Sequence, residues 1–325
     1  MDDILVSISC ITYNHEKYIA DAIESFLMQK TNFKYEILIH DDASTDRTVE
    51  IIEKYRKKYP DIIKPIYQKE NQYSKGIRIS ATFQYPRAKG KYIAICEGDD
   101  YWTDPYKLQK QVDYMEKHPE CSMCVHAAYK VNDNTKKIAG KMRPSPNNKV
   151  FTIEEVILGG GDLFPTNSIL FARKFSKLPQ FYYNSPVGDY PLMIYLASCG
   201  PVYYIDEYMS VYRIGSSDSW TSRMLNTNAE HKTKHTNAIV NMLKEVDEYT
   251  NRKYTENINK RIIKERFDLL VSIGRFNEAK TGIFRSYYKS LSLVDKARLF
   301  IKEYFPNITK ILRIVKRKYM LWKLS

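Results

Sequence analysis

A buried strand that ends in a cluster of acids constrains this chain more than any other segment. Tyr92 to Tyr101 reads YIAICEGDDY, so an apolar run leads directly into Glu97, Asp99 and Asp100. Such a run is typical of a buried strand. Carboxylates crowded at a strand end repel one another and resist burial, so they need a cation or contact with water. Their oxygens suit Mg²⁺ or Mn²⁺, and the simpler alternative is a solvated acidic turn.

Two earlier segments repeat a plan of strand, polar loop and helix. Ile4 to Ile11 is rich in β-branched residues and predicts a buried, parallel strand. The loop Thr12-Tyr13-Asn14 follows it, and apolar residues at helical spacing predict a helix from Tyr18 to Leu27. This segment therefore forms a first β-α unit.

The second unit begins with a strand from Tyr35 to Ile39 and continues into the loop HDDASTD. Ser44 or Thr45 can cap the helix that follows. The pattern gives no structural role to Asp41 and Asp42, which makes both of them candidate binding residues.

These units predict an α/β fold with an open, mainly parallel sheet. A third strand spans Ile62 to Tyr67, and the strand beginning at Tyr92 is the fourth. Ligands of such sheets bind outside the carboxyl ends of the strands, where the loops at Thr12, Asp41 and Glu97 all lie. We therefore expect a functional site at this edge.

The later part of the chain predicts further strands and then long helices. Ser122 to Val131 predicts a strand, and the polar Asn132 to Asn148 predicts an exposed excursion. Asp189 begins an apolar helix, where an acid is often only a cap, and Tyr208 to Ile214 predicts another strand. Long helical patterns follow Thr221. We expect a catalytic domain over 1–220, divided into halves 1–125 and 126–220, and a helical region over 221–325.

The positive charge of the chain is concentrated at its end. Of a net charge of +13, the last thirty residues contribute +8, with nine Lys or Arg against Glu303 alone. Residues 306–325 follow an amphipathic helical pattern, which predicts contact with an anionic membrane surface; the alternative is a final helix packed on the rest of the protein. The start of the chain lacks the basic region of a secretory signal, and no apolar stretch reaches the length of a membrane span. The sequence predicts a cytoplasmic protein, peripheral at the inner face of the cell membrane.

Three motifs together resemble the family-two glycosyltransferases of the GT-A fold. They are ISCITYNHEKYI, IHDDASTD, where the family usually has Asp-Asp-Gly-Ser, and CEGDDYW at the Asp-x-Asp position. The likeness covers roughly Ile4 to Trp220. It implies a Rossmann-like mixed sheet flanked by helices, and transfer of a sugar from a UDP- or GDP-sugar to an acceptor hydroxyl with inversion. It also implies a glycan or lipid-linked acceptor in surface polysaccharide synthesis.

The resemblance implies roles for individual residues. Thr12, Tyr13 and Asn14 would surround the nucleotide, and Asp41 or Asp42 would contact the base. Glu97, Asp99 and Asp100 would lie at ribose, diphosphate and metal, with Asp99 and Asp100 as ligands of Mn²⁺ or Mg²⁺. Asp189 would act as the general base that accepts the proton of the acceptor.

The chain departs from the family pattern at three places. Glu97 replaces the first aspartate of the usual motif, and Gly188 precedes Asp189 where the family has two acids. Tyr212-Arg213 is followed by Ile214 rather than leading to a histidine, so no third metal ligand is assigned.

Two other functions fit an α/β fold with this edge. A sugar-nucleotide nucleotidyltransferase usually has a glycine-rich basic loop after the first strand, which Thr12-Tyr13-Asn14-His15 is not. A non-catalytic module could bind a nucleotide or nucleic acid, but the chain lacks the interleaved aromatic and basic residues of an RNA-binding sheet. We therefore expect no nucleic-acid partner.

Overall fold

One ten-stranded sheet organises the fold in the computed structural model, which describes residues 4–215 and 227–305. The strands are β1 (Ile4–Thr12), β2 (Lys34–Asp41), β3 (Ile63–Tyr67), β4 (Tyr92–Ile95), β5 (Tyr101–Trp102), β6 (Met123–Asn132), β7 (Lys137–Met142), β8 (Lys149–Phe151), β9 (Leu170–Ala172) and β10 (Val202–Ile214).

The sheet is mixed. Its main order is β3-β2-β1-β4-β9-β6-β10-β5, with β7 paired to β6 and β8 paired to β10. Strands β3, β2, β1 and β4 are parallel to one another, whereas β9 runs antiparallel to both β4 and β6. The four strands expected from the first half of the chain are therefore confirmed as one parallel unit.

Local sequence explains the order of these parallel strands. Residues Val6 to Cys10 of β1 are all buried, as expected for a strand with neighbours on both sides and helices on both faces. Pro65 lies in β3, the first strand of the order, because a proline has no N–H to give to a second neighbour.

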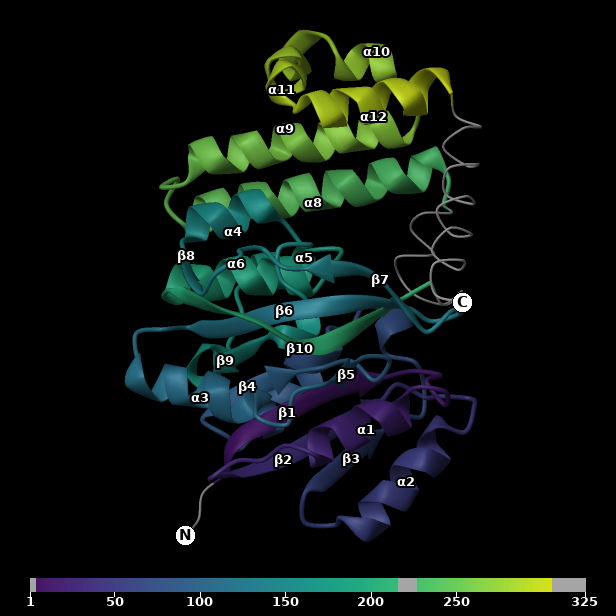
Figure 1. The fold of residues 1–325 in the computed structure, drawn as a ribbon, viewed down its shortest axis with the longest axis vertical. Coiled ribbons are helices and arrows are strands. Elements are labelled where there is room, and N and C mark those ends of the chain that lie inside the picture. The colour runs from purple at the N-terminus through teal and green to yellow at the C-terminus, as the bar shows by residue number, and fades with distance from the viewer. Residues whose placement is uncertain (1–3, 216–226, 306–325) are drawn as a thin grey trace.

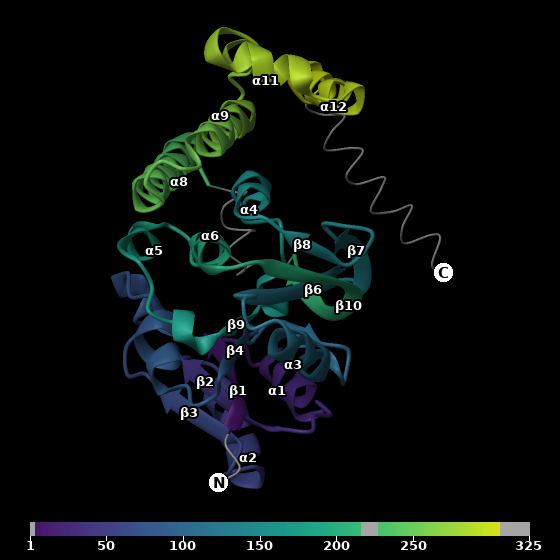
Figure 2. The same ribbon diagram turned by 90° about the vertical axis from the view of Figure 1, so that its left-hand side faces the viewer.

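Helices cover both faces of the sheet (Figures 1 and 2). They are α1 (Ile19–Leu27), α2 (Thr48–Lys58), α3 (Lys107–Lys117), α4 (Ile153–Gly159), α5 (Gln180–Asn184), α6 (Asp189–Cys199), α8 (Ala229–Tyr249), α9 (Thr255–Ser272), α10 (Phe276–Ala279), α11 (Arg285–Ser290) and α12 (Leu293–Tyr304). None of these described helices is both long and apolar enough to cross a bilayer.

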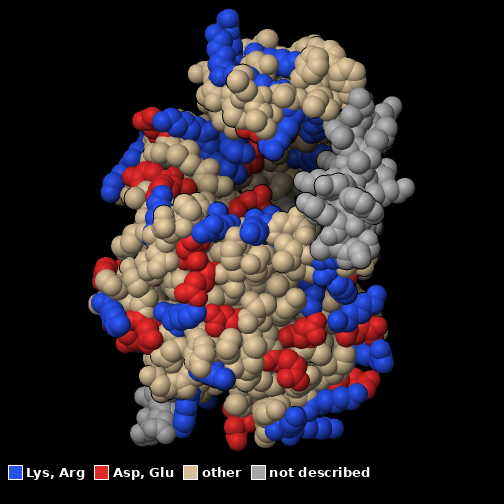
Figure 3. Space-filling model, viewed as in Figure 1, with Lys and Arg blue, Asp and Glu red and all other residues tan. Residues whose placement is uncertain are grey.

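Two hydrophobic cores lie on opposite faces of the sheet. One packs α1, α2 and α3 against it, with Phe26 and Trp102 in edge contact at 4.8 Å between ring centroids. The other joins α4, α5 and α6 to α8 and α9. Figures 1 and 2 show α8 and α9 lying beyond α4, with α10, α11 and α12 farther from the sheet. In Figure 3 that far end is largely uncharged and bordered by Lys and Arg.

The structure corrects two expectations about connecting segments. The expected excursion over Asn132 to Asn148 contains β7, which pairs with β6 as an outer strand and has half of its residues exposed. The polar, glycine-bearing sequence after Tyr67 also predicts a helix before the strand that begins at Tyr92, but the segment forms only short helical turns at Tyr73–Lys75, Ser80–Gln84 and Tyr85–Arg87. The helical C-terminal region is confirmed over its described part. The amphipathic segment 306–325 lies outside the described residues, and the domain boundary at 220 stays a prediction.

Candidate active site

Three loops meet at the carboxyl ends of β1, β2 and β4, as the sequence predicts. Thr12 and Asp41 are register partners at the ends of β1 and β2. The N–H of Asp42 donates to the Thr12 carbonyl at 3.0 Å, and that of Gly98 donates to the Ile11 carbonyl at 2.9 Å. These bonds bring the three loops to one edge of the sheet.

The close approach of two of these loops requires a glycine. A Cβ on Gly98 would lie 2.8 Å from both Cβ and Oγ1 of Thr12. Thr12 is buried, and its Oγ1 has no partner among the described residues. Only glycine therefore allows the acidic turn to lie against the first loop.

The first loop is fixed by the second. Asn14 adopts a left-handed backbone with φ of 54°, and its N–H donates to Ser44 Oγ at 2.9 Å. Its Oδ1 accepts from the Thr45 N–H at 2.8 Å. Tyr13 is left 44% exposed beside these bonds, so its ring is open to contact with a ligand.

Both aspartates of the second loop have structural bonds that the sequence did not reveal. Asp41 accepts bonds from the N–H and the hydroxyl of Ser44. Asp42 accepts from the N–H groups of Gln72 and Tyr73 at 2.8 and 3.0 Å, which fixes the segment after β3. Burial raises the pKa of Asp41, and the bonds from Ser44 oppose that shift. The expectation that these two acids lack a structural role is wrong, while their contact with a base stays a prediction.

Asp100 is held by the protein itself. It is 1% exposed, and its two carboxylate oxygens accept from Asn167 Nδ2 at 2.9 Å and from the Arg213 N–H at 2.8 Å. Burial raises the pKa of Asp100, the charge of Asp99 adds to this, and the bond from Arg213 opposes it.

Asp99 is placed differently. The Arg213 guanidinium donates to its backbone carbonyl at 2.6 Å, and no described side chain donates to its carboxylate. The described residues contain no group of three His, Cys, Asp or Glu side chains arranged around a metal. The carboxylates of Asp99 and Asp100 still fit Mg²⁺ or Mn²⁺, because such cations commonly bind through one or two carboxylates, water and substrate phosphates. Asp99 fits as a ligand better than Asp100, whose oxygens already have donors.

Glu97 and Asp189 lie near each other although they are far apart in the sequence. Burial raises the pKa of Glu97 to about 8, and the charges of Asp99 and Asp189 add to the shift. Asp189 begins α6, and its Oδ1 accepts from the Tyr190 N–H at 2.7 Å. Burial raises the pKa of Asp189, which moves it toward the range useful for a general base. Asp189 is thus close enough to the acidic turn for its charge to act on Glu97.

The sequence analysis missed three side chains around this cluster. Asn167 is fully buried beneath the acidic turn. Arg78 and Tyr182 lie beside each other, with the guanidinium carbon 5.8 Å from the ring centroid. Burial raises the pKa of Tyr182 to about 12, the positive charge of Arg78 opposes the shift, and the charge of Asp189 adds to it. No local pattern marks these residues, because long-range folding brings them together.

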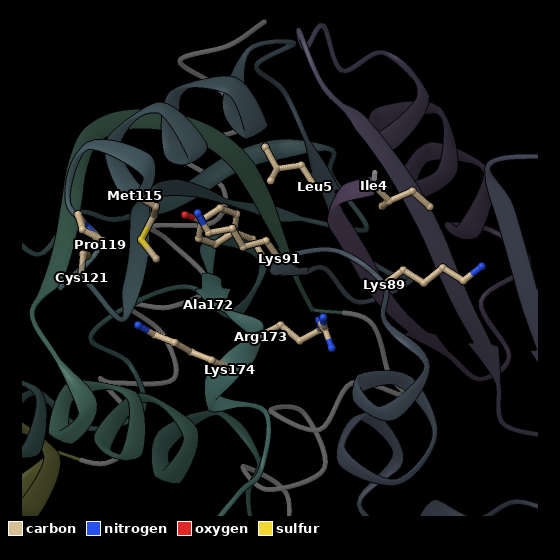
Figure 4. Close-up of a pocket in the computed structure, with 11 residues that line it drawn as sticks. Ile4, Leu5, Lys89, Lys91, Met115, Pro119, Cys121, Ala172, Arg173 and Lys174 are labelled. Carbon is tan, nitrogen blue, oxygen red and sulfur yellow. The ribbon is translucent and has the colours of Figure 1, made fainter. Parts of the chain in front are cut away.

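A cavity of about 770 Å³ lies elsewhere, at the amino ends of β1 and β4 (Figure 4). Ile4 and Tyr92, the first residues of those strands, help to line it, as do Lys89, Arg173 and Lys174. It is therefore at the opposite edge from the acidic turn and separate from the candidate active site.

Comparison with curated proteins finds relatives in bacteria. The chain is 35% identical to the uncharacterized protein Rv1520 of Mycobacterium tuberculosis over 223 residues, which are 67% of this chain and 61% of that relative. It is 39% identical over 112 residues, 34% of this chain and 41% of the relative, to WfaP of Escherichia coli. WfaP is described as a UDP-Glc:alpha-D-GlcNAc-diphosphoundecaprenol beta-1,3-glucosyltransferase. The chain thus spans less than two thirds of the length of these relatives.

Solved structures share the fold. TarS of S. aureus, in complex with UDP-GlcNAc, matches 83% of this chain and 82% of its own with a TM-score of 0.53 and 17% identity. The mannosyltransferase PcManGT of Pyrobaculum calidifontis, in complex with GDP-Man and Mn²⁺, matches 93% and 87% with a TM-score of 0.51 and 12% identity. The expected GT-A fold is confirmed. Since the model of the glycosyl transferase family 2 matches residues 7–178, more than half of the chain, this protein belongs to that family.

Proposed function

We propose that the protein transfers a sugar from a UDP- or GDP-sugar to a hydroxyl of a glycan or lipid-linked acceptor, with inversion at the anomeric carbon. The observation that carries this proposal is the meeting of Glu97, Asp99 and Asp189 at the edge formed by the three loops. The acidic turn lies against the first loop, and Asp189 begins a helix from the later half of the fold.

The donor would bind across the first two loops. Tyr13 presents an exposed ring, Thr12 lies against the acidic turn, and Asn14 bonds to the second loop. Asp41 and Asp42 border the same loops and are the candidate contacts of the base. The nucleotide sugars bound to the two structural neighbours, UDP-GlcNAc and GDP-Man, support a nucleoside-diphosphate sugar as the donor class.

Departure of a nucleoside diphosphate requires its developing charge to be neutralised. A divalent cation, Mn²⁺ or Mg²⁺, held at Asp99 with Asp100 behind it, would supply that positive charge when bound. Glu97 lies beside Asp99 and would orient the ribose or the diphosphate. Arg213 fixes the backbone of Asp99 and so sets the position of the carboxylate.

Asp189 would accept the proton of the acceptor hydroxyl. Its place at the amino end of α6, close enough for its charge to act on Glu97, supports this role. A single displacement with one base inverts the anomeric centre, which is why we propose inversion. The acceptor in the name of WfaP, a sugar linked to diphosphoundecaprenol, supports an acceptor linked to a polyprenyl diphosphate.

A panel of nucleotide sugars, each with and without Mn²⁺, tests this function. The true donor should raise the melting temperature, because a ligand that binds the native state stabilises it, and the enzyme should release its nucleoside diphosphate slowly even without acceptor. The Asp99→Asn variant is the control, because it should lose the release of nucleoside diphosphate if that release takes place at the candidate active site. If no UDP- or GDP-sugar stabilises the protein or is turned over, the proposal is wrong. Retention of the anomeric configuration in the product would disprove the single displacement.

A further inference from the structure

One side of α12 carries a continuous apolar stripe on the surface. Leu293, Ala297, Phe300 and Tyr304 follow one another at steps of four, three and four residues and so share a face of the helix. Leu293 is 84% exposed, Phe300 54% and Tyr304 58%. The other side of the helix buries Leu299 in a small core with α9 and α10. The helix is therefore apolar on two sides: one apolar face is covered, and the other is open.

Neighbouring side chains widen this stripe into a patch. Val294, next to Leu293, is 59% exposed, and Phe305, next to Tyr304, is 46% exposed. The rings of Phe300 and Tyr304 lie 4.8 Å apart between centroids, so the aromatic groups form one surface. Apolar side chains this exposed and this close together mark an interaction surface rather than ordinary scatter.

The charges around the patch are predominantly basic. From Lys280 to Phe305 the chain has six Lys or Arg and two acids. Both acids are paired, Asp295 with Arg298 at 3.0 Å and Glu303 with Lys280. The sequence of 306–325 adds six further Lys or Arg and no acid. An apolar stripe flanked by positive charge is the arrangement that binds the surface of an anionic bilayer.

We propose that the open face of α12 docks on anionic phospholipid, with Leu293, Phe300 and Tyr304 inserted at headgroup depth. This inference rests on the proposed function, because an enzyme that acts on a lipid-linked acceptor must work at the membrane. A second copy of the chain is a poorer occupant, since pairing two such patches would bring their excess positive charges together. The patch lies at the far end of the molecule from α2 and β3 (Figures 1 and 2), so docking leaves the donor loops uncovered.

Vesicle binding of the full chain tests the proposal. The protein should cosediment with vesicles of phosphatidylglycerol and phosphatidylcholine in equal amounts, and much less with phosphatidylcholine alone. Replacing Leu293, Phe300 and Tyr304 together by serine should weaken binding to the anionic vesicles at least tenfold, because the inserted apolar area is lost. The segment 306–325 is present in every variant, so the difference reports the α12 face.

A matched variant controls for the loss of apolar surface in general. Ile138, Val150 and Leu158 are also exposed, at 54%, 50% and 39%, but lie on β7, β8 and α4. Their joint replacement by serine should leave vesicle binding within twofold of the unaltered protein. Equal binding of the α12 variant and the unaltered protein would overturn the proposal. A different result would also overturn it: light scattering shows a stable dimer for the unaltered protein and a monomer for the α12 variant, and neither protein binds vesicles.

Failure of this inference can be told apart from failure of the proposed function. Release of nucleoside diphosphate from the donor without acceptor should be unchanged in the α12 variant, because the patch is remote from the acidic turn. If the protein turns over a nucleotide sugar but does not bind vesicles, only the proposal that α12 docks on a membrane is wrong. Vesicle binding without turnover of any nucleotide sugar would reject only the proposed chemistry.

Discussion

The side-chain amide of Asn167 lies 2.9 Å from the carboxylate of Asp100, and this contact holds the acidic turn to the other half of the sheet. The same amide nitrogen donates to the Val211 carbonyl at 2.8 Å, and its oxygen accepts from Ser210 Oγ at 2.7 Å. Trp102 Nε1 donates to the Asn167 carbonyl at 2.9 Å. Asn167 therefore ties the turn to β10 through a fully buried network, and the position of Asp99 depends on it.

Replacing Asn167 by alanine should therefore reduce both stability and turnover. The change leaves Asp100, Ser210 and Val211 each short of one buried partner, and we expect a loss of about 3 kcal/mol in the free energy of unfolding. Turnover should fall about 100-fold, because a shift of the turn misplaces Asp99. Urea denaturation and kinetics measure the two effects. Asn184→Ala is the control, since Asn184 is exposed and should change stability by no more than about 0.5 kcal/mol.

Asp99 and Asp100 should respond differently to replacement by asparagine. Asp99→Asn should lower metal-dependent turnover about 100-fold or more without lowering the melting temperature, because no described side chain bonds to its carboxylate and its charge repels Glu97 and Asp100. Asp100→Asn should also cost about 1–3 kcal/mol of stability, since its amide would face the N–H of Arg213 or of Asn167. Thermal denaturation and nucleotide release separate the two outcomes. Normal turnover of Asp99→Asn would remove this residue from the metal site.

The strand-end residues could be predicted because each follows a buried strand with a clear local pattern. Thr12, Asp41 and Glu97 lie where apolar runs end, and parallel strands must bring such positions to one edge. The structure confirms this convergence. The same reasoning could not separate Asp99 from Asp100, since burial and hydrogen bonding differ between the two only after the turn packs against Asn167.

The residues that were missed depend on pairing between distant segments. Asn167 enters the site because β9, which follows it, runs antiparallel to both β4 and β6. In the sequence it is one polar residue in FPTNSILFAR, with no motif around it. The strand β7 was missed because it is short and lies within a mostly polar segment, which resembles a loop. Non-local pairing of this kind leaves no periodic signal in a single segment.

Asp189→Asn should abolish transfer while leaving donor binding intact. Asp189 lies at the start of α6, where burial raises its pKa, and its proposed partner is the acceptor rather than the nucleotide. We expect kcat to fall about 100-fold or more and the stabilisation by donor to stay the same. Thermal shift and single-turnover assays measure the two quantities. An unchanged kcat would assign the base to another residue.

Replacing Ala43 by glycine should stabilise the protein. Ala43 has a φ of 65° between Asp42 and Ser44, at the position where the family pattern has glycine. A left-handed backbone strains an alanine, and we expect a gain of up to about 1 kcal/mol, reduced by the greater freedom of glycine in the unfolded chain. Ala20→Gly is the matched control: Ala20 lies within α1, so the same change should cost about 0.5–1 kcal/mol. A lower free energy of unfolding for Ala43→Gly would contradict the strain.

Lys107 should make stability depend on pH. Its side chain is 0% exposed, with Nζ 3.9 Å from the Trp102 ring centroid and no hydrogen-bond partner among the described residues. Burial lowers the pKa of Lys107 from 10.5 to about 7, so the unfolded chain binds this proton more readily between those values. Stability should thus rise with pH across this range, by about 2 kcal/mol from pH 7 to 9.

Lys107→Met removes this titration and tests it directly. The variant should be more stable than the unaltered protein at pH 7, by about 2 kcal/mol. This difference should shrink toward pH 9, because the unaltered protein must release the proton of Lys107 on folding, and that release costs less free energy as the pH rises. Comparing the two proteins at each pH by urea denaturation cancels the titration of all other groups. Lys117→Met, at an exposed position of the same helix, should show a difference that does not vary with pH. If the difference in free energy of unfolding between Lys107→Met and the unaltered protein also does not vary with pH, the prediction is wrong. Lys107 would then keep its ordinary pKa in the folded protein, with its charge stabilised by the Trp102 ring.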